Sequence, residues 1–166
     1  RNSGIVNLYS REFFTLARQH LKPGGIMLQW VQAYDLPPED LQMIVKTFRE
    51  AFPATIVWYV GGDFLLQGSV SPAPLDLNLL KTRFQAIPAL RRNLAYLDIH
   101  GWSGVLSYFL LGEADAARYS DGAALNTDDF PALEFQIRAE RNTPMRPDLL
   151  AEDPARFGVR LPQKPA

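Results

Sequence analysis

The stretch LKPGGIMLQWVQAYDLPPEDL, residues 21–41, decides the fold class. Its apolar run, Gly25 to Gln32, has the length of a strand, and such a run suits a strand buried on both faces, as in a parallel sheet. The KPGG turn before this run ends a helix, because Pro cannot continue a helix and Gly tolerates positive φ. The two prolines and the acidic pair Glu39–Asp40 after the run are typical of a helix start. Helix, turn, strand, loop and helix in this order predict an α/β domain.

The sequence on either side extends this α/β pattern. Ser10 is a good N-cap for the helix that precedes the stretch. Two further apolar runs, Ala54–Val60 and the DFLLQGS run after it, are joined by Gly61–Gly62. This pair favours a tight antiparallel hairpin, because both turn positions can take positive φ. Residues 1–70 are therefore predicted as α-β-α-β-β. The second helix is predicted from apolar residues that recur with helical spacing, namely Leu41, Ile44, Val45, Phe48 and Phe52.

The rest of the chain is expected to be helical and then irregular. Residues 71–141 are predicted as a helical extension, with two short helices separated at Pro88 and one or two more in GWSGVLSYFLLGEADAARYS. A short strand is expected over Ala132–Arg138. Residues 142–166 carry five prolines, and we expect this tail to be extended or poorly ordered.

Composition narrows the possible functions. The chain has 166 residues, of which 47% are hydrophobic, enough for one domain with a real core. Its net charge of −1 predicts neither a nucleic-acid partner nor an anionic membrane surface. With no cysteine and only two histidines, thiolate and multi-histidine metal sites are excluded. No apolar run long enough to span a membrane and no leader sequence is found, so a cytoplasmic location is expected.

Two separated phrases resemble the spermidine/spermine synthase family. The first, residues 8–41, contains REFFTLARQHLKPGG and QWVQAYDLPPEDL, and the second, Leu125–Phe135, reads LNTDDFPALEF. The closest likeness is to bacterial spermidine synthase-like proteins, often fused to a membrane segment, and it covers about Gly4 to Arg138. The opening at Arg1 also reads like the middle of a longer sequence, although a trimmed chain would read the same way.

The resemblance implies a partial Rossmann fold of the class I methyltransferase type. The full sheet of that fold has the strand order 3-2-1-4-5-7-6, and this chain would supply strands 5-7-6. The family transfers an aminopropyl group from decarboxylated S-adenosylmethionine to a diamine. It uses a glycine-rich loop and a ribose-binding acid for the nucleoside, and an aspartate after the fourth strand for catalysis. No G-x-G-x-x-G motif occurs here, and no Asp precedes Asp35.

The resemblance therefore assigns this chain to the C-terminal half of such an enzyme. It would contain no catalytic residue and bind no cofactor, and it would be inactive without the N-terminal half as a partner. Two alternatives stay open. The chain could belong to an S-adenosylmethionine-dependent methyltransferase of another specificity, or it could be a non-catalytic interaction module.

Candidate substrate residues follow from the same resemblance. Ligands of open α/β sheets bind beyond the carboxyl ends of strands, which here points to Trp30 and Gln32. The family carries an amine-contacting Tyr at the position of Trp58, with Tyr59 beside it. Aromatic faces at these positions could hold an alkylammonium group by cation–π attraction worth about 0.5–2 kcal/mol.

Each of these residues could instead have a purely structural role. The two tryptophans could be core residues, and the glutamine could satisfy main-chain groups at the end of the strand. Asp128 and Asp129 in LNTDDFP could bind an amine, or could cap a helix or order a turn.

A last expectation concerns the strand over Gly25–Gln32. Without a fourth strand beside it, this strand would be an unpaired apolar edge, and such edges favour pairing with another chain. We therefore expect either a homodimer, in which two copies of this strand pair across a two-fold axis into one six-stranded sheet, or coverage of the edge by the helices of residues 76–120.

Overall fold

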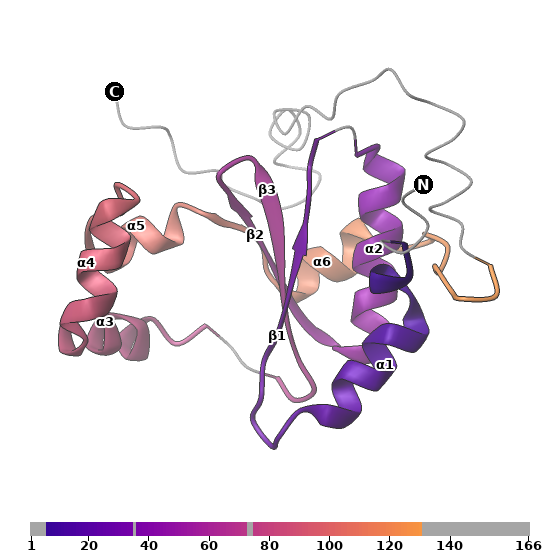
Figure 1. Cartoon of the computed structure of the whole chain (residues 1–166), viewed down its shortest axis with the longest axis horizontal. Coiled ribbons are helices and arrows are strands. Elements are labelled where there is room, and N and C mark those ends of the chain that lie inside the picture. The colour runs from indigo at the N-terminus through magenta and orange to yellow at the C-terminus, as the bar shows by residue number, and fades with distance from the viewer. Residues whose placement is uncertain (1–5, 35, 73–74, 131–166) are drawn as a thin grey trace.

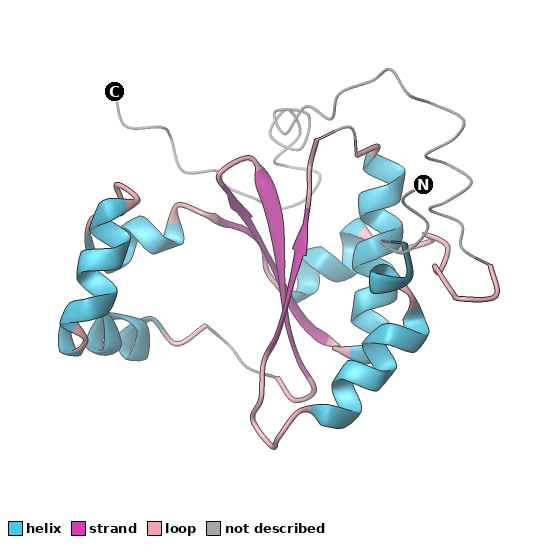
Figure 2. Cartoon of the chain, viewed as in Figure 1, coloured by secondary structure: helices cyan, strands magenta, loops and turns pink. Residues whose placement is uncertain are grey.

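The protein is an α/β fold built on an open four-stranded sheet, with helices packed against it (Figures 1 and 2). The computed structural model describes residues 6–34, 36–72 and 75–130. The strand expected over 132–138 and the proline-rich tail lie outside these ranges. The strands are β1 (Met27–Val31), β2 (Ala54–Val60), β3 (Asp63–Ser69) and β4 (Phe109–Leu111). The helices are η1 (Val6–Tyr9), α1 (Arg11–His20), α2 (Pro38–Ala51), α3 (Leu77–Ala86), α4 (Pro88–Tyr96), α5 (Gly101–Leu106) and α6 (Glu113–Tyr119).

The strand order in the sheet is β1-β3-β2-β4, and each neighbouring pair is antiparallel. The expectation of a strand buried on both faces over Gly25–Gln32 is wrong, because β1 is an edge strand among the described ones and Leu28 and Trp30 are half-exposed on one face. The predicted hairpin is confirmed, because β2 and β3 pair along their whole length from Ala54↔Ser69 to Val60↔Asp63. Its turn residues Gly61 and Gly62 have φ of 62° and 97°, a region that only glycine enters at low cost. The second strand of the hairpin lies between β1 and β2, the order expected for these three strands.

Strand β4 was not expected. The sequence GWSGVLSYFLLGEADAARYS was predicted to hold one or two helices and no strand; α5 and α6 lie in it, yet Phe109–Leu111 between them pairs with β2. Three residues are too short a run to give a strand pattern, and the strand depends on contacts distant in sequence. The Phe109 and Trp58 rings meet edge to face with centroids 5.7 Å apart, and Tyr59 donates its N–H to the Tyr108 carbonyl at 2.8 Å.

The core lies on one face of the sheet, under α1, α2 and α6. The predicted apolar face of α2 is fully buried there. The rings of Phe14 and Phe48 meet edge to face at 5.0 Å, and Phe48 lies 4.9 Å from Phe52. Gly68 of β3 allows this close approach, because a Cβ atom at that position would lie 2.5 Å from the Phe48 ring and 2.6 Å from the Phe52 Cβ. The predicted N-cap is also confirmed, since the Ser10 hydroxyl accepts the Phe13 N–H at 3.2 Å.

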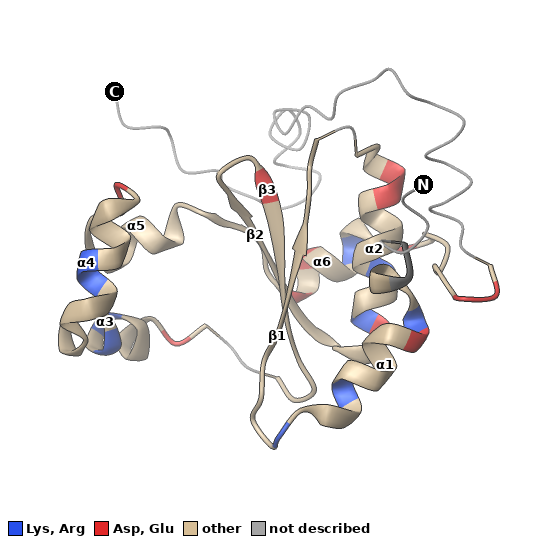
Figure 3. Cartoon of the chain, in the orientation of Figure 1, with Lys and Arg blue, Asp and Glu red and all other residues tan. Residues whose placement is uncertain are grey.

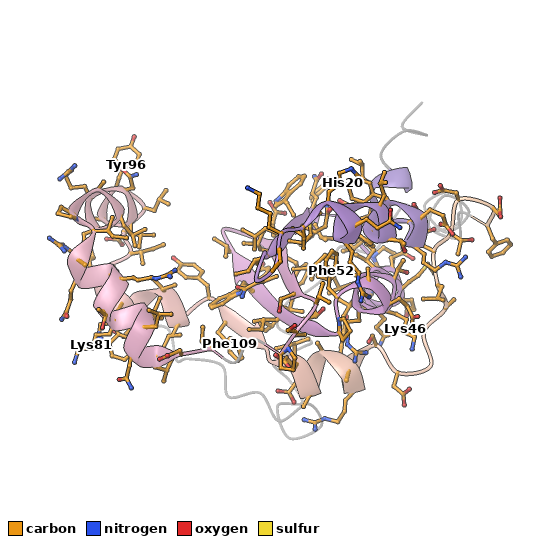
Figure 4. The ribbon with its side chains drawn as sticks, turned by 90° about the horizontal axis from the view of Figure 1, so that it is seen from below. His20, Lys46, Phe52, Lys81, Tyr96 and Phe109 are labelled. Atoms are coloured by element: carbon orange, nitrogen blue, oxygen red, sulfur yellow. The ribbon has the colours of Figure 1, made fainter. Side chains whose placement is uncertain are left out.

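Helices α3, α4 and α5 form a separate group beside the sheet (Figures 1 and 4). They pack chiefly on one another and bury few side chains, of which Phe84 and Ile99 are the main ones. Tyr96 points away from the rest of the molecule in Figure 4 and is 91% exposed. Within the described ranges, no helix has both the length and the apolar character needed to cross a membrane.

Candidate functional site: an acidic and aromatic corner of the sheet

Trp30 and Trp58 lie on the same face of the sheet, on one rung that crosses all four strands. Leu65 of β3 is paired with Trp30 of β1 on one side and with Trp58 of β2 on the other. Phe109 of β4 continues the rung next to Trp58. Side chains alternate along a strand, and Gly68, three residues beyond Leu65 in β3, faces α2, so the tryptophan rung faces away from the helical core. The register therefore aligns two sequence-predicted residues on the face opposite the helical core, where Trp30 is half-exposed and Trp58 is buried.

Asp63 ties the end of β1 to the tip of the β2–β3 hairpin. Its carboxylate accepts the indole N–H of Trp30 at 3.2 Å and the main-chain N–H of Ala33 at 2.9 Å. Asp63 opens β3 directly after the Gly61–Gly62 turn, and this turn determines where the carboxylate is placed. The side chain of Trp30 is thereby held in a fixed orientation even though the residue is 53% exposed.

Two tyrosines respond to the charge of Asp63. The pKa of Tyr9 is raised above its ordinary value by burial and, secondly, by the negative charge of Asp63. The pKa of Tyr59 is raised by the same two causes in the same order. Acidic side chains occur at this end of the sheet, at the start of β3 and at the start of α2, whereas Lys and Arg occur on α1, α3, α4 and farther along α2 (Figure 3). The described charged side chains nearest this corner are therefore acidic.

A carboxylate beside an ordered, half-exposed indole is suited to a cation. Asp63 can accept further hydrogen bonds, since each carboxylate offers about four lone-pair sites. Trp30 offers an aromatic face, and Tyr34, 75% exposed, follows Ala33 in the adjoining loop. An alkylammonium group can use both the charge and the aromatic face, with a cation–π contribution of about 0.5–2 kcal/mol.

The other residues predicted near this corner are placed differently. Tyr59 lies on the opposite face from Trp58, next to it in the strand, and its ring is 5.2 Å from that of Phe64. The Trp58 indole N–H donates to the Gln67 side chain at 3.1 Å, and Trp58 is only 9% exposed. Gln32 is exposed just beyond the end of β1. Of the aromatic residues predicted to contact an amine, Trp30 is the accessible one.

Asp128 and Asp129 are not brought to this corner. They lie in an exposed loop next to the start of α1, on the far side of the helical layer from the sheet (Figures 1 and 3). The main-chain N–H of Asp128 donates to the Glu12 carboxylate at 2.9 Å, and this bond is the main cause of a lowered pKa at Glu12. Buried Asn126 extends the attachment, because its carbonyl accepts the Arg11 N–H at 2.9 Å and its N–H donates to Thr47 Oγ1 at 3.0 Å. These contacts agree with the alternative in which the LNTDD segment orders the chain and does not bind an amine.

A cavity of about 440 Å³ opens at the other end of the strands. It is bounded by the turn over Leu21–Ile26 and by the end of β3 over Ser69–Pro72. Among the described residues that line it, Lys22 is the one that carries a charge, and no cluster of their polar groups converges on the cavity. Among the described residues, no three His, Asp or Glu side chains lie close enough to hold a metal ion. We therefore base the candidate site on the corner around Asp63.

Comparison with protein-family models, with curated proteins and with solved structures finds no significant match to this chain.

Asp63 is the site residue that the sequence analysis missed. The sequence analysis placed it only as the first residue of the DFLLQGS strand and gave it no role in a site. The available signal was an acidic residue at the start of an otherwise apolar strand. The strand pairing that brings it to Trp30, 33 residues away in sequence, could not be derived from the local pattern.

Proposed function

We propose that this chain provides the amine-binding side of an aminopropyltransferase similar to spermidine synthases. The observation that carries the proposal is the corner formed by Asp63 and Trp30, a carboxylate and an aromatic face with no Lys or Arg among the described residues that bond to it. A linear diamine is cationic at neutral pH and matches both features. The order β1-β3-β2 supports the proposal, since it is the order of strands 5, 7 and 6 in the methyltransferase-like sheet.

In the proposed reaction the amine nitrogen attacks the propyl carbon of decarboxylated S-adenosylmethionine. A C–N bond forms, the C–S bond breaks, the sulfur leaves as a neutral thioether, and the amine proton passes to a base. Asp63 would hold the distal ammonium group of the diamine, and Trp30 would shield it from water. The nucleoside-binding loop and the catalytic aspartate would come from the N-terminal half of the domain. Neither glycine pair of this chain replaces that loop, because Gly61–Gly62 forms a hairpin turn and Gly24–Gly25 joins a helix to a strand. The parent protein would work in the cytoplasm, with or without a fused membrane segment.

Isothermal titration calorimetry with a linear diamine tests the amine site. We expect the chain to bind the diamine, and we expect Asp63→Asn to weaken binding by about tenfold or more, because a charge-assisted contact is lost. Asp98→Asn removes one negative charge from an exposed residue between α4 and α5 and serves as the matched control. A diol of equal length should not bind. Equal affinities for the diamine and the diol, or no effect of Asp63→Asn, would exclude the site.

S-adenosyl compounds separate the two enzymatic alternatives. The proposal expects no binding of S-adenosylmethionine or of its decarboxylated form by this chain alone. Binding of S-adenosylmethionine without diamine binding would favour a methyltransferase. The alternative of a non-catalytic interaction module is favoured by a different observation, which is that no described strand pairs with the outer edge of β1.

A further inference from the structure

The segment that follows α6, orange in Figure 1, returns to the start of α1 and is bonded there through its main chain. Asn126 of this segment is fully buried between two helices. Its carbonyl accepts the N–H of Arg11 on α1 at 2.9 Å, and its N–H donates to Thr47 Oγ1 on α2 at 3.0 Å. Thr47 is fully buried as well, and its hydroxyl donates to the Met43 carbonyl at 2.7 Å. One hydroxyl on α2 therefore holds the main chain that holds the first turn of α1.

The first turn of α1 continues directly from η1. Ser10 caps α1 by accepting the Phe13 N–H, and Tyr9, the last residue of η1, comes immediately before this cap. The cap determines the direction in which the chain enters the helix. The N–H that Asn126 holds belongs to the second residue after Tyr9. The place of Tyr9 therefore depends on where α1 begins.

Tyr9 connects this point to the corner around Asp63. Its hydroxyl donates to the Trp30 carbonyl at 3.3 Å, beside the Gln29 side-chain amide, which donates to the same oxygen at 2.9 Å. The Trp30 indole N–H donates in turn to the Asp63 carboxylate at 3.2 Å. Burial and, secondly, the charge of Asp63 raise the pKa of Tyr9, which agrees with a phenol close to this carboxylate. Tyr9 thus contacts the main chain of the residue whose side chain forms the aromatic half of the site.

We infer that Thr47 is a positioning residue for Trp30 in the amine site. Its hydroxyl acts through the main chain of Asn126 and through the start of α1, which places Tyr9 against the Trp30 carbonyl. Such a bonded network changes affinity at a distant site when one of its members can shift. The inference rests on the proposed function, because it concerns the same site.

Thr55 offers a matched control in the same core. It is fully buried, and its hydroxyl donates to the Phe52 carbonyl at 2.6 Å. Thr55 lies near the start of β2, whereas Asp63 pairs with the last residue of that strand. Thr47→Val and Thr55→Val therefore remove the same group from equally buried positions, and only Thr47→Val breaks the connection to the site.

Calorimetry with a linear diamine measures the effect on affinity. We expect Thr47→Val to weaken diamine binding by about threefold or more and Thr47→Ser, which keeps the hydroxyl, to restore most of the affinity. Thr55→Val should bind as tightly as the unmodified chain. Equal weakening by the two valine variants, or a serine variant as weak as Thr47→Val, would overturn the inference. If the unmodified chain does not bind the diamine, the proposed function fails, and the position of Trp30, measured without ligand, decides the inference.

Nitrogen-15 NMR follows Trp30 directly. The chain has three tryptophans and so three indole N–H resonances, and Trp30→Phe identifies the one that belongs to Trp30. We expect Thr47→Val to shift the Trp30 resonance and to leave that of Trp58, which is bonded to Gln67, in place. Thr47→Ser and Thr55→Val should leave both resonances in place. A general loss of packing would move both resonances together. An unshifted Trp30 resonance in Thr47→Val, or equal shifts of Trp30 and Trp58, would contradict the inference.

Discussion

The carboxylate of Asp63 receives the indole N–H of Trp30 at 3.2 Å and so connects the tip of a hairpin to the end of the neighbouring strand. The same carboxylate holds the N–H of Ala33 at 2.9 Å, where the chain leaves the sheet toward α2. One side chain thus orders an exposed tryptophan and the adjoining loop. The charge that makes the corner suitable for a cation also has a structural role, and the two roles can be separated by experiment.

Asp63→Asn should lower the pKa of both Tyr9 and Tyr59. The negative charge of Asp63 is the second cause of the raised pKa at each tyrosine, and the substitution removes it while burial, the first cause, remains. A spectrophotometric titration of tyrosinate absorbance should therefore begin at a lower pH in the variant. Tyr119, whose pKa is raised by burial and by Glu39, should titrate as before. A titration curve identical to that of the unmodified protein would show that the charge does not reach the tyrosines.

Gly68→Ala should destabilise the fold by about 1–3 kcal/mol, the usual cost of adding a methyl group to a filled core. A Cβ at this position would lie 2.5 Å from the Phe48 ring and 2.6 Å from the Phe52 Cβ, so α2 would have to move away from the sheet. Guanidinium unfolding followed by circular dichroism measures the change. Gly112→Ala is the control, because a Cβ there would meet its nearest atom at 3.5 Å. A stability loss no larger than that of the control would mean that the helix layer is less closely packed.

Glu12→Gln should reduce stability at neutral pH and have no effect in acid. The pKa of Glu12 lies below its ordinary value of 4.5, mainly because its carboxylate accepts the Asp128 N–H. A group with a lowered folded-state pKa stabilises the fold above its ordinary pKa, and this stabilisation is lost as pH falls through the folded value. The side chain is exposed, so we expect less than about 1 kcal/mol. Melting temperatures of both proteins, measured from pH 7 down to pH 3, should draw together as the pH falls below 4.5 and through the lowered folded-state pKa. If the difference in melting temperature stayed constant over this range, the effect of Glu12→Gln would come from the changed shape of the side chain and not from the lost charge.

Phe109→Ala should loosen β4 without unfolding the sheet. An aromatic edge-to-face pair is worth about 0.5–1.5 kcal/mol beyond its buried area, and the substitution removes the pair with Trp58. The amide of Tyr59, which donates to Tyr108, should then exchange with solvent roughly twofold to tenfold faster. The amide of Leu66 in β3 serves as the internal reference. Unchanged exchange at Tyr59 would mean that main-chain pairing alone holds β4 in place.

Local pattern was sufficient to predict the hairpin, the buried face of α2 and the Ser10 cap. Each of these depends on residues close together in sequence, and each is confirmed. The pattern did not predict β4, because three residues acquire their strand conformation only by pairing with β2. It also placed Trp58 and Tyr59 together, although adjacent residues of a strand face opposite sides of a sheet. Asp63 was missed for the same reason as β4, since its partners come from another strand.

The helices α3–α5 leave the sheet after β3 and return at β4, and they satisfy most of their packing among themselves. Substitutions in these helices should therefore spread little strain to the rest of the protein, and this segment can diverge in sequence faster than the layer formed by α1 and α2. The short strand β4 then fixes where the chain returns to the sheet, even if the sequence of helices α3–α5 changes.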